Sequence, residues 1–213
     1  MMRFGLIGHP LAGSGSPSLF AEAYKGRWPY DLIEGSDFEL SWQQFLSDYQ
    51  AVNITAPFKE AAFARLAEDG RLSPECEATG AINIAVKTPD GLAGYNSDYL
   101  GVRKILSSEG FGAGDVAVVA GFGGAGKAAA AAARSLGMDV TVCNRTRKPV
   151  EAGAGRSGGC PAGIGSFSRP LEELPLLASV ADILIYTLPA SVPQAEGLSC
   201  PVLLEANYRT PRM

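Results

Sequence analysis

The most informative residues of this chain are glycines that follow a short apolar run. Residues 116–120 read Val-Ala-Val-Val-Ala, and the pattern G-x-G-x-x-G comes next, ahead of an alanine-rich stretch. In such a strand–turn–helix unit, the glycines permit a tight turn, close approach of a pyrophosphate and close packing of helix against strand. The phosphates then lie at the positively polarised start of the helix. A plain glycine turn is the alternative, but the context predicts a dinucleotide site formed by Gly121, Gly123, Gly124, Ala125 and Gly126.

The end of the next strand indicates which dinucleotide is bound. Sites specific for NAD place Asp or Glu about 20 residues after the first glycine, where it binds the ribose hydroxyls. Residues 142–148 read Val-Cys-Asn-Arg-Thr-Arg-Lys, without a carboxylate and with three cations. Guanidinium groups bind a 2′-phosphate in forked geometry, so this segment favours NADP over NAD. A solvated basic loop is the alternative, since exposed Arg and Lys clusters are common.

The single histidine, His9, restricts the proton chemistry of the chain. It excludes histidine triads, histidine general bases and metal sites with several histidines. Four cysteines show no C-x-x-C spacing, which indicates neither a zinc site nor a disulfide framework. Any proton transfer must therefore use Lys, Asp, Glu, Tyr or Cys, and we expect no metal.

Composition excludes several classes of protein. The chain has 213 residues, of which 46% are hydrophobic and 19% charged, as in a folded protein of one large or two small domains. A net charge of −4 without long Lys/Arg runs argues against a nucleic-acid partner. No apolar run approaches the ~18 residues of a membrane span, and the N-terminus lacks a signal-peptide pattern. We therefore expect a cytoplasmic protein that binds neither nucleic acid nor membrane.

Short β-branched runs alternate with helical patterns, as is typical of α/β units on parallel sheets. The predicted helices cover residues 16–25, with Ser16 as N-cap ahead of Pro17, then 58–67 and 98–108. The predicted strands cover residues 4–7, 32–33, 52–54, 116–120, 140–143, 183–186 and 202–204.

Two further segments organise the chain. Residues 82–86 and 92–95 flank Thr-Pro-Asp-Gly, which predicts an antiparallel hairpin at a sheet edge. Residues 153–165 hold six glycines and a proline, which predicts a surface loop. We place a domain boundary near 98–101.

Polar clusters follow the strands of the first half, where ligands bind in α/β sheets. They lie at residues 10–17, 53–59, 80–83 and 94–98. Their patterns S-x-S-P, N-x-T-x-P-x-K, G-A-x-N and G-x-N-x-D stand in the same order as in the shikimate dehydrogenases, and the match covers nearly the whole chain. The chain therefore resembles this family.

The resemblance implies a two-domain α/β fold, with a substrate-binding catalytic domain at 1–98 and a Rossmann NADP-binding domain at 99–213. It implies NADPH-dependent reversible reduction of 3-dehydroshikimate to shikimate, a step of chorismate and aromatic amino acid biosynthesis. A catabolic quinate or shikimate dehydrogenase and a non-catalytic NADP-binding relative are the alternatives. A monomer or a homodimer is expected.

The family's site residues transfer by position. By resemblance, Ser14 and Ser16 hold the substrate carboxylate, while Thr55, Asn83 and Asp98 bind its hydroxyls. Lys59 and Asp98 match the catalytic dyad. The remaining matches are Asn144, Arg145, Thr146 and Arg147 on the cofactor, Thr187 near the nicotinamide and Tyr208 near the substrate. The segments around Thr187 and Tyr208 depart from the family patterns.

The proposed dyad is chemically reasonable. Hydride reduction of a ketone creates an alkoxide that must receive a proton, and a desolvated lysine can donate one near neutral pH. A carboxylate at Asp98 favours the charged ammonium of Lys59 and so opposes that shift. The donor is therefore Lys59, Asp98 or water. Taken singly, Lys59 also fits a solvated helix residue, and Asp98 and Ser16 fit N-caps.

The family continues past the region of Tyr208 into a G-x-x-M-L-x-x-Q-A segment. The resemblance therefore predicts that this chain is a truncated form that lacks roughly 30 residues of two terminal helices, which return to cover the first domain in the family. Without them, we expect an apolar strip on that domain. We then expect NADPH binding to persist and shikimate affinity to be weak.

Overall fold

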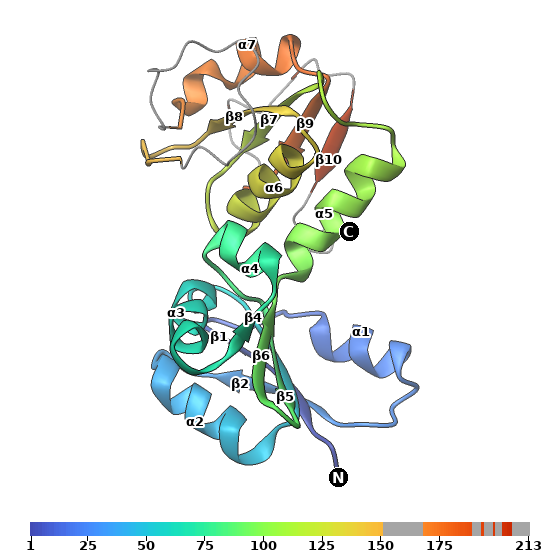
Figure 1. The fold of residues 1–213 in the computed structure, drawn as a ribbon, viewed down its shortest axis with the longest axis vertical. Coiled ribbons are helices and arrows are strands. Elements are labelled where there is room, and N and C mark those ends of the chain that lie inside the picture. The colour runs from blue at the N-terminus through green and yellow to red at the C-terminus, as the bar shows by residue number, and fades with distance from the viewer. Residues whose placement is uncertain (151–167, 189–192, 194–197, 199–201, 206–213) are drawn as a thin grey trace. The chain divides into compact units, whose positions relative to one another are not determined.

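A computed structural model of the chain describes residues 1–150, 168–188, 193, 198 and 202–205. The chain divides into two compact units, Met1–Ser97 and Asp98–Met213. Within the described residues, each unit carries its own sheet, with six strands in the first and four in the second (Figure 1). The predicted α/β class is confirmed. The loop predicted at residues 153–165 lies outside the described residues, as does Tyr208.

The first sheet has the strand order β2-β1-β3-β5-β6-β4, and β2 and β3 both pair parallel with β1. In β3, the buried Val52 and Ile54 alternate with partly buried residues, which is the period expected of a strand, whereas four consecutive residues of the interior strand β1 are buried. The strands are β1 (Phe4–Gly8), β2 (Tyr30–Glu34), β3 (Ala51–Ile54), β4 (Arg71–Leu72), β5 (Ile84–Thr88) and β6 (Gly91–Tyr95).

The predicted hairpin is confirmed as β5 and β6, but its predicted place at a sheet edge is wrong. β5 pairs antiparallel with β3, and β6 pairs parallel with the two-residue strand β4, which takes the edge. So short a strand leaves no alternating pattern in the sequence. Its pairing with Ala93 and Gly94 is set by the tertiary structure alone.

Helices cover both faces of the first sheet, with α1 on the side opposite α2 and α3 (Figure 1). The core lies beneath α2 and α3, where Trp42 and Phe45 pack on Ile7 and Ile54. On the α1 side the cover is partial, because Leu32 and Tyr95 stay 43% and 40% exposed. The helices are α1 (Ser16–Ala23), α2 (Phe38–Asp48), α3 (Lys59–Asp69) and α4 (Pro74–Thr79).

The start of α1 differs from the prediction. Gly15, not Ser16, is the N-cap residue, and Ser16 is the first residue of the helix. The hydroxyl of Ser14 accepts a hydrogen bond from the Ser16 N–H at 3.3 Å, so a side chain two residues upstream satisfies this helix-terminal donor. The helix ends at Ala23, two residues before the predicted end.

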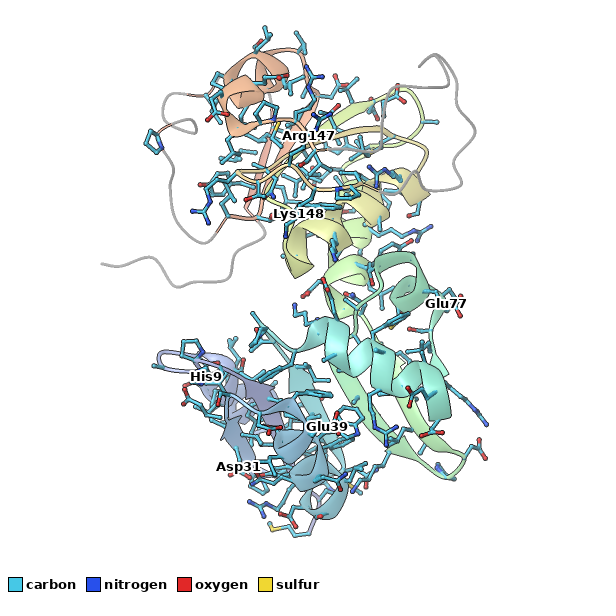
Figure 2. The ribbon with its side chains drawn as sticks, turned by 90° about the vertical axis from the view of Figure 1, so that its left-hand side faces the viewer. His9, Asp31, Glu39, Glu77, Arg147 and Lys148 are labelled. Carbon is cyan, nitrogen blue, oxygen red and sulfur yellow. The ribbon has the colours of Figure 1, made fainter. Side chains whose placement is uncertain are left out.

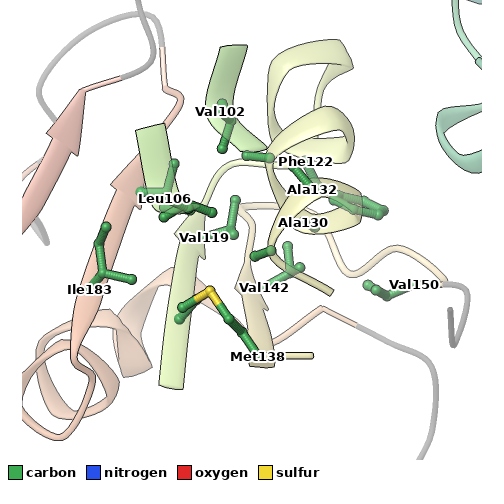
Figure 3. Close-up of a cluster of buried hydrophobic side chains, with 14 residues drawn as sticks. Val102, Leu106, Val119, Phe122, Ala130, Ala132, Met138, Val142, Val150 and Ile183 are labelled. Carbon is green, nitrogen blue, oxygen red and sulfur yellow. The ribbon is translucent and has the colours of Figure 1, made fainter. Parts of the chain in front are cut away.

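The second unit has a fully parallel sheet with the order β10-β9-β7-β8, so β7 is an interior strand. Side chains of α5 and α6 form one core with this sheet, including Val102, Leu106, Val119 and Ile183 (Figure 3). The elements are α5 (Ser97–Ser108), β7 (Val116–Ala120), α6 (Gly124–Ser135), β8 (Asp139–Cys143), α7 (Leu174–Ser179), β9 (Ile183–Tyr186) and β10 (Leu203–Glu205), with a 3₁₀ turn at Leu171–Glu173.

The alanine run of α6 explains how closely helix and sheet approach. Ala129, Ala130, Ala132 and Ala133 have no exposed surface. Small side chains let the helix axis lie near β7, which places the start of α6 directly after the glycine turn. Among the residues that the structure describes, no helix has the length and apolar character needed to cross a membrane.

Candidate active site

The polar clusters of the first unit meet at one edge of its sheet. Ile7 of β1 pairs with Ile33 of β2 and Ile54 of β3, so the loops after these parallel strands begin side by side. The next strand, β5, runs antiparallel to β3 and starts where β3 ends, while β6 ends opposite that start, with Tyr95 paired to Ile84. One edge of the sheet, formed by the carboxyl ends of β1 and β3 and the start of β5, therefore carries the segments of Ser14, Ser16, Thr55, Lys59 and Asn83.

The loop after β1 packs directly on the loop after β3. A Cβ at Gly8 would lie 2.4 Å from Cγ2 of Thr55 and 2.7 Å from Cδ2 of Leu11, so only glycine fits there. The N–H of Thr55 donates to the Ile7 carbonyl at 2.9 Å, and the N–H of His9 donates to the Ala56 carbonyl at 3.1 Å. These contacts hold the serine-bearing loop beside Thr55.

Tyr30 supports Ser16, although sequence reasoning missed it. Its hydroxyl donates to Oδ1 of Asn53 at 2.8 Å and is also hydrogen-bonded to the side chain of Ser16. Because the phenol has one hydrogen and gives it to Asn53, it must accept the bond from Ser16. Burial raises the pKa of Tyr30 to about 12, partly opposed by the Ser16 bond. Asn53, Tyr30 and Ser16 thus form a hydrogen-bonded chain beneath the predicted carboxylate site.

Asn83 is held by the end of the hairpin. Its Nδ2 donates to the Ser97 hydroxyl at 2.9 Å, and its Oδ1 accepts the Ser97 N–H at 2.8 Å. Only 7% of Asn83 is exposed. Asn96 is 1% exposed, and its Nδ2 donates to Oγ1 of Thr79 and the carbonyl of Ala81, both at 3.0 Å. The segment that precedes Asn83 is therefore fixed by side-chain amides on both sides.

Lys59 and Asp98 each lie in the first turn of a helix. Lys59 is the first residue of α3 and is half-buried, and its carbonyl accepts the Ile82 N–H at 3.1 Å. Asp98 lies in the first turn of α5 and is half-buried too. A carboxylate in the first turn of a helix is stabilised by the backbone dipoles. Lys59 belongs to the first unit and Asp98 to the second.

The glycine turn of the second unit follows β7 as predicted. Gly121 has φ of +102°, a left-handed conformation that favours glycine, and a Cβ at Gly126 would lie 2.2 Å from the Gly121 carbonyl oxygen. Local structure therefore requires both glycines. A Cβ at Gly123 would meet no protein atom within 4 Å, although Gly123 is the N-cap residue of α6. Packing does not require this glycine, so its backbone is open to a ligand.

The basic loop after β8 is tied to the glycine turn. Oδ1 of Asn144 accepts the Phe122 N–H at 3.2 Å, and its Nδ2 donates to the Thr146 carbonyl at 2.8 Å. The N–H of Lys148 donates to the Ser168 hydroxyl at 3.0 Å, and the Ser168 N–H donates to the Lys148 carbonyl at 2.8 Å. Sequence reasoning missed Ser168, which holds the end of this loop.

The cations of this loop face solvent. Arg145, Arg147 and Lys148 are all exposed, and Figure 2 shows Arg147 and Lys148 on the loop that follows β8. The residues of this segment include no carboxylate. Its charge and its link to the glycine turn through Asn144 suit a phosphorylated ribose next to a pyrophosphate.

Thr187 lies directly after β9, against the glycine turn. Its hydroxyl donates to the carbonyl of Ala120 at 2.9 Å. The structure thus brings Thr187 beside Gly121 and Gly126. No group of three or more His, Cys, Asp or Glu side chains suited to a metal ion occurs within the described parts of the chain.

Comparisons with known proteins agree with this arrangement. No protein-family model matches the chain. It is 36% identical over 151 residues to a shikimate dehydrogenase (NADP(+)) of Thermus thermophilus, which covers 68% of this chain and 56% of the relative. It is 31% identical over 193 residues to the enzyme of the same name from Halobacterium salinarum, which covers 84% of this chain and 69% of the relative. The chain therefore spans 56% to 69% of the length of these two relatives.

Solved structures show the same similarity. The crystal structure of shikimate 5-dehydrogenase from Thermus thermophilus in complex with NADP(H) and shikimate matches with a TM-score of 0.67 and 30% identity, over 91% of this chain and 73% of that chain. Shikimate dehydrogenase 1 from Peptoclostridium difficile matches with a TM-score of 0.66 and 28% identity, over 93% of this chain and 71% of that chain. With the motifs in order and their residues placed at the sheet edge and the glycine turn, this chain belongs to the shikimate dehydrogenase family.

Proposed function

We propose that this protein catalyses the reversible, NADPH-dependent reduction of 3-dehydroshikimate to shikimate. The observation that carries the proposal is the convergence of Ser14, Ser16, Thr55, Lys59 and Asn83 at one sheet edge, in a chain whose second sheet bears an NADP-type turn. The names of the relatives and the bound molecules of the Thermus thermophilus structure support it.

The first unit would bind the substrate. Ser14 would donate its hydroxyl hydrogen to the carboxylate, and Ser16 would do so by exchanging its bond to Tyr30 for one to the substrate. Thr55 and Asn83 would bind the ring hydroxyls together with Asp98. The polar side chain of Asn83 is already oriented by Ser97, so little ordering remains to be done when the substrate binds.

The second unit would bind NADP. The open backbone at Gly123 and the uncapped start of α6 fit a pyrophosphate, and the carboxylate-free loop fits a 2′-phosphate through Arg145 and Arg147. When bound, the cofactor supplies or accepts the hydride. The chain's own contribution is to orient it: Asn144 holds the turn and the basic loop together.

Lys59 and Asp98 would supply the proton that the reduced substrate needs. Reduction of the carbonyl leaves an alkoxide, and His9 is the chain's single histidine, so a lysine ammonium is the natural donor. In this proposal Lys59 gives its proton to the alkoxide, and Asp98 is the second member of the dyad. Tyr208 remains a prediction for the substrate side, and Thr187 is reconsidered below.

The test is a substrate and cofactor matrix with the purified chain. Shikimate and quinate are each offered with NADP+ and with NAD+, and nucleotide reduction is followed by absorbance. We expect turnover of shikimate with NADP+ and of none of the other three combinations. Turnover of quinate with NAD+ would support a catabolic quinate dehydrogenase instead. Tight NADPH binding without turnover of either substrate would support a non-catalytic relative.

The location and the oligomeric state of the protein are proposals too. We propose a cytoplasmic monomer or homodimer. Light scattering coupled to gel filtration would distinguish these two states, and a larger assembly would contradict both.

A further inference from the structure

Thr187, the residue after β9, lies beside Gly121, the first glycine of the turn. Ala120 of β7 pairs with Tyr186 of β9, so the next residue, Thr187, stands beside Gly121. The N–H and the hydroxyl of Thr187 both donate to the carbonyl of Ala120, each at 2.9 Å. Two donors from one residue therefore hold the carbonyl that begins the turn.

The same hydroxyl fills the space that two glycines leave. A Cβ at Gly121 would lie 2.6 Å from Oγ1 of Thr187, and a Cβ at Gly126 would lie 3.0 Å from it. A side chain at the first or third glycine of the motif would therefore crowd this threonine. The peptide between Ala120 and Gly121 cannot rotate without breaking its bonds to Thr187.

The turn is held from its other side by Asn144. Oδ1 of this residue accepts the Phe122 N–H, one residue after Gly121, and the N–H of Gly121 donates to the Cys143 carbonyl at 2.8 Å. Residues at the ends of β8 and β9 therefore hydrogen-bond to consecutive peptides of the turn, and Thr187 makes the bonds from the end of β9. The position of the open Gly123 backbone depends on both.

We propose that Thr187 is a positioning residue for the pyrophosphate site, acting through the Ala120–Gly121 peptide rather than by touching the nicotinamide. A threonine hydroxyl has one hydrogen, and here it is given to Ala120, so none is left to donate to a ligand. This inference rests on the proposed NADP site. It reassigns the residue that the family resemblance places near the nicotinamide.

The experiment compares two ligands that differ only in the nicotinamide. Dissociation constants for NADPH and for 2′-phospho-ADP-ribose are measured by calorimetry for the parent chain, Thr187→Val and Thr187→Ser. Valine has the shape of threonine without the hydroxyl, and Ala120 keeps the bond from the backbone N–H of residue 187. We therefore expect the valine variant to fold, which circular dichroism and thermal unfolding would check.

Thr187→Val should weaken both ligands by the same factor, about five- to tenfold, the effect of one lost hydrogen bond. Thr187→Ser keeps the hydroxyl and should bind both within about twofold of the parent. The matched control is Thr88→Val, which removes a hydroxyl bonded to the Gly91 carbonyl in the first unit and should leave both affinities unchanged.

Four results would overturn the inference. Weakening of NADPH alone would show that Thr187 contacts the nicotinamide. Parental affinities in Thr187→Val, or a loss that serine does not rescue, would show that the hydroxyl does not position the turn. Failure of the parent chain to bind either ligand would instead refute the NADP site of the proposed function, and this inference with it.

Discussion

Asn83 and Ser97 exchange two hydrogen bonds, one in each direction. The Ser97 N–H can only donate, so the atom of Asn83 that faces it at 2.8 Å must be the amide oxygen. The amide nitrogen then faces the Ser97 hydroxyl at 2.9 Å and keeps a second N–H for another acceptor. The amide of Asn83 is therefore oriented before any ligand arrives, as its proposed contact with a substrate hydroxyl requires.

Ser97→Ala should disturb substrate binding more than turnover. The variant keeps the N–H that fixes Oδ1 but loses the hydroxyl that holds Nδ2. We expect the KM for shikimate to rise by about three- to tenfold with kcat within twofold, since one neutral hydrogen bond is worth about 1 kcal/mol. Steady-state kinetics checks this. Ser107→Ala, which removes an exposed hydroxyl from the same helix, is the control and should change neither constant.

Lys59→Met should abolish most of the catalysis while cofactor binding persists. Methionine keeps an unbranched apolar chain but lacks the ammonium, so we expect kcat to fall by about 10²–10⁴, the usual contribution of general acid–base catalysis. The NADPH dissociation constant should not change. Stopped-flow and equilibrium titration would measure the two effects, with the exposed Lys104→Met as control. A variant with parental turnover would show that Lys59 is only a solvated helix residue.

Arg145→Ala should change the cofactor preference. The exposed guanidinium is suited to the 2′-phosphate, and a charge-assisted hydrogen bond is worth about 1.5–3 kcal/mol. The KM for NADPH should rise at least about tenfold, whereas the KM for NADH should scarcely move. Equal effects on the two cofactors would contradict the NADP assignment. Arg103→Ala, an exposed arginine of α5, provides the matched control.

Two glycines of the turn should respond to alanine in opposite ways. At Gly126 the new methyl group would lie 2.2 Å from the Gly121 carbonyl oxygen, so the free energy of unfolding should fall by about 1–3 kcal/mol. At Gly123 the methyl group meets no protein atom, so stability should change by less than about 1 kcal/mol.

Binding should then separate the two variants. Gly123→Ala should fold normally and bind NADPH at least about tenfold more weakly, because its methyl group takes the space that a pyrophosphate needs. Urea unfolding and calorimetry test this pair. Parental affinity in Gly123→Ala would show that the pyrophosphate does not approach this peptide.

Tyr30 should make stability decrease in strongly alkaline solution. Its pKa is about 12 in the folded protein because of burial, whereas an unfolded tyrosine ionises near 10. The unfolded state therefore loses its proton first. The stabilisation is complete below pH 10 and is lost as the pH rises from about 10 to 12, with a slope of at most about 1.4 kcal/mol per pH unit.

Urea unfolding of the parent and of Tyr30→Phe at several pH values would measure this contribution. The variant should be about 1–3 kcal/mol less stable at pH 8, because Asn53 loses a donor. Its stability should fall less steeply above pH 10. Tyr24→Phe alters an exposed tyrosine and should keep the parental slope. Identical slopes in the parent and Tyr30→Phe would exclude Tyr30 as the source.

Local chemistry made several features predictable. The glycine turn after residues 116–120 and the hairpin of β5 and β6 depend on backbone conformations that few residue types adopt. The helix α2 is absent from the sequence-based predictions, although Asp37 caps it through the Leu40 N–H and Phe38, Trp42 and Phe45 lie at helical spacing.

The sequence by itself determined which residue types carry the chemistry and which short segments present them, since turns, caps and periodicity depend on neighbours along the chain. Tertiary structure alone decided what each side chain meets. Tyr30 reaches Asn53 because parallel pairing places β2 and β3 on either side of β1, and Thr187 meets Ala120 because β9 pairs with β7. Such contacts join residues 23 and 67 positions apart, and strand order, which no local pattern encodes, brings them within hydrogen-bond distance.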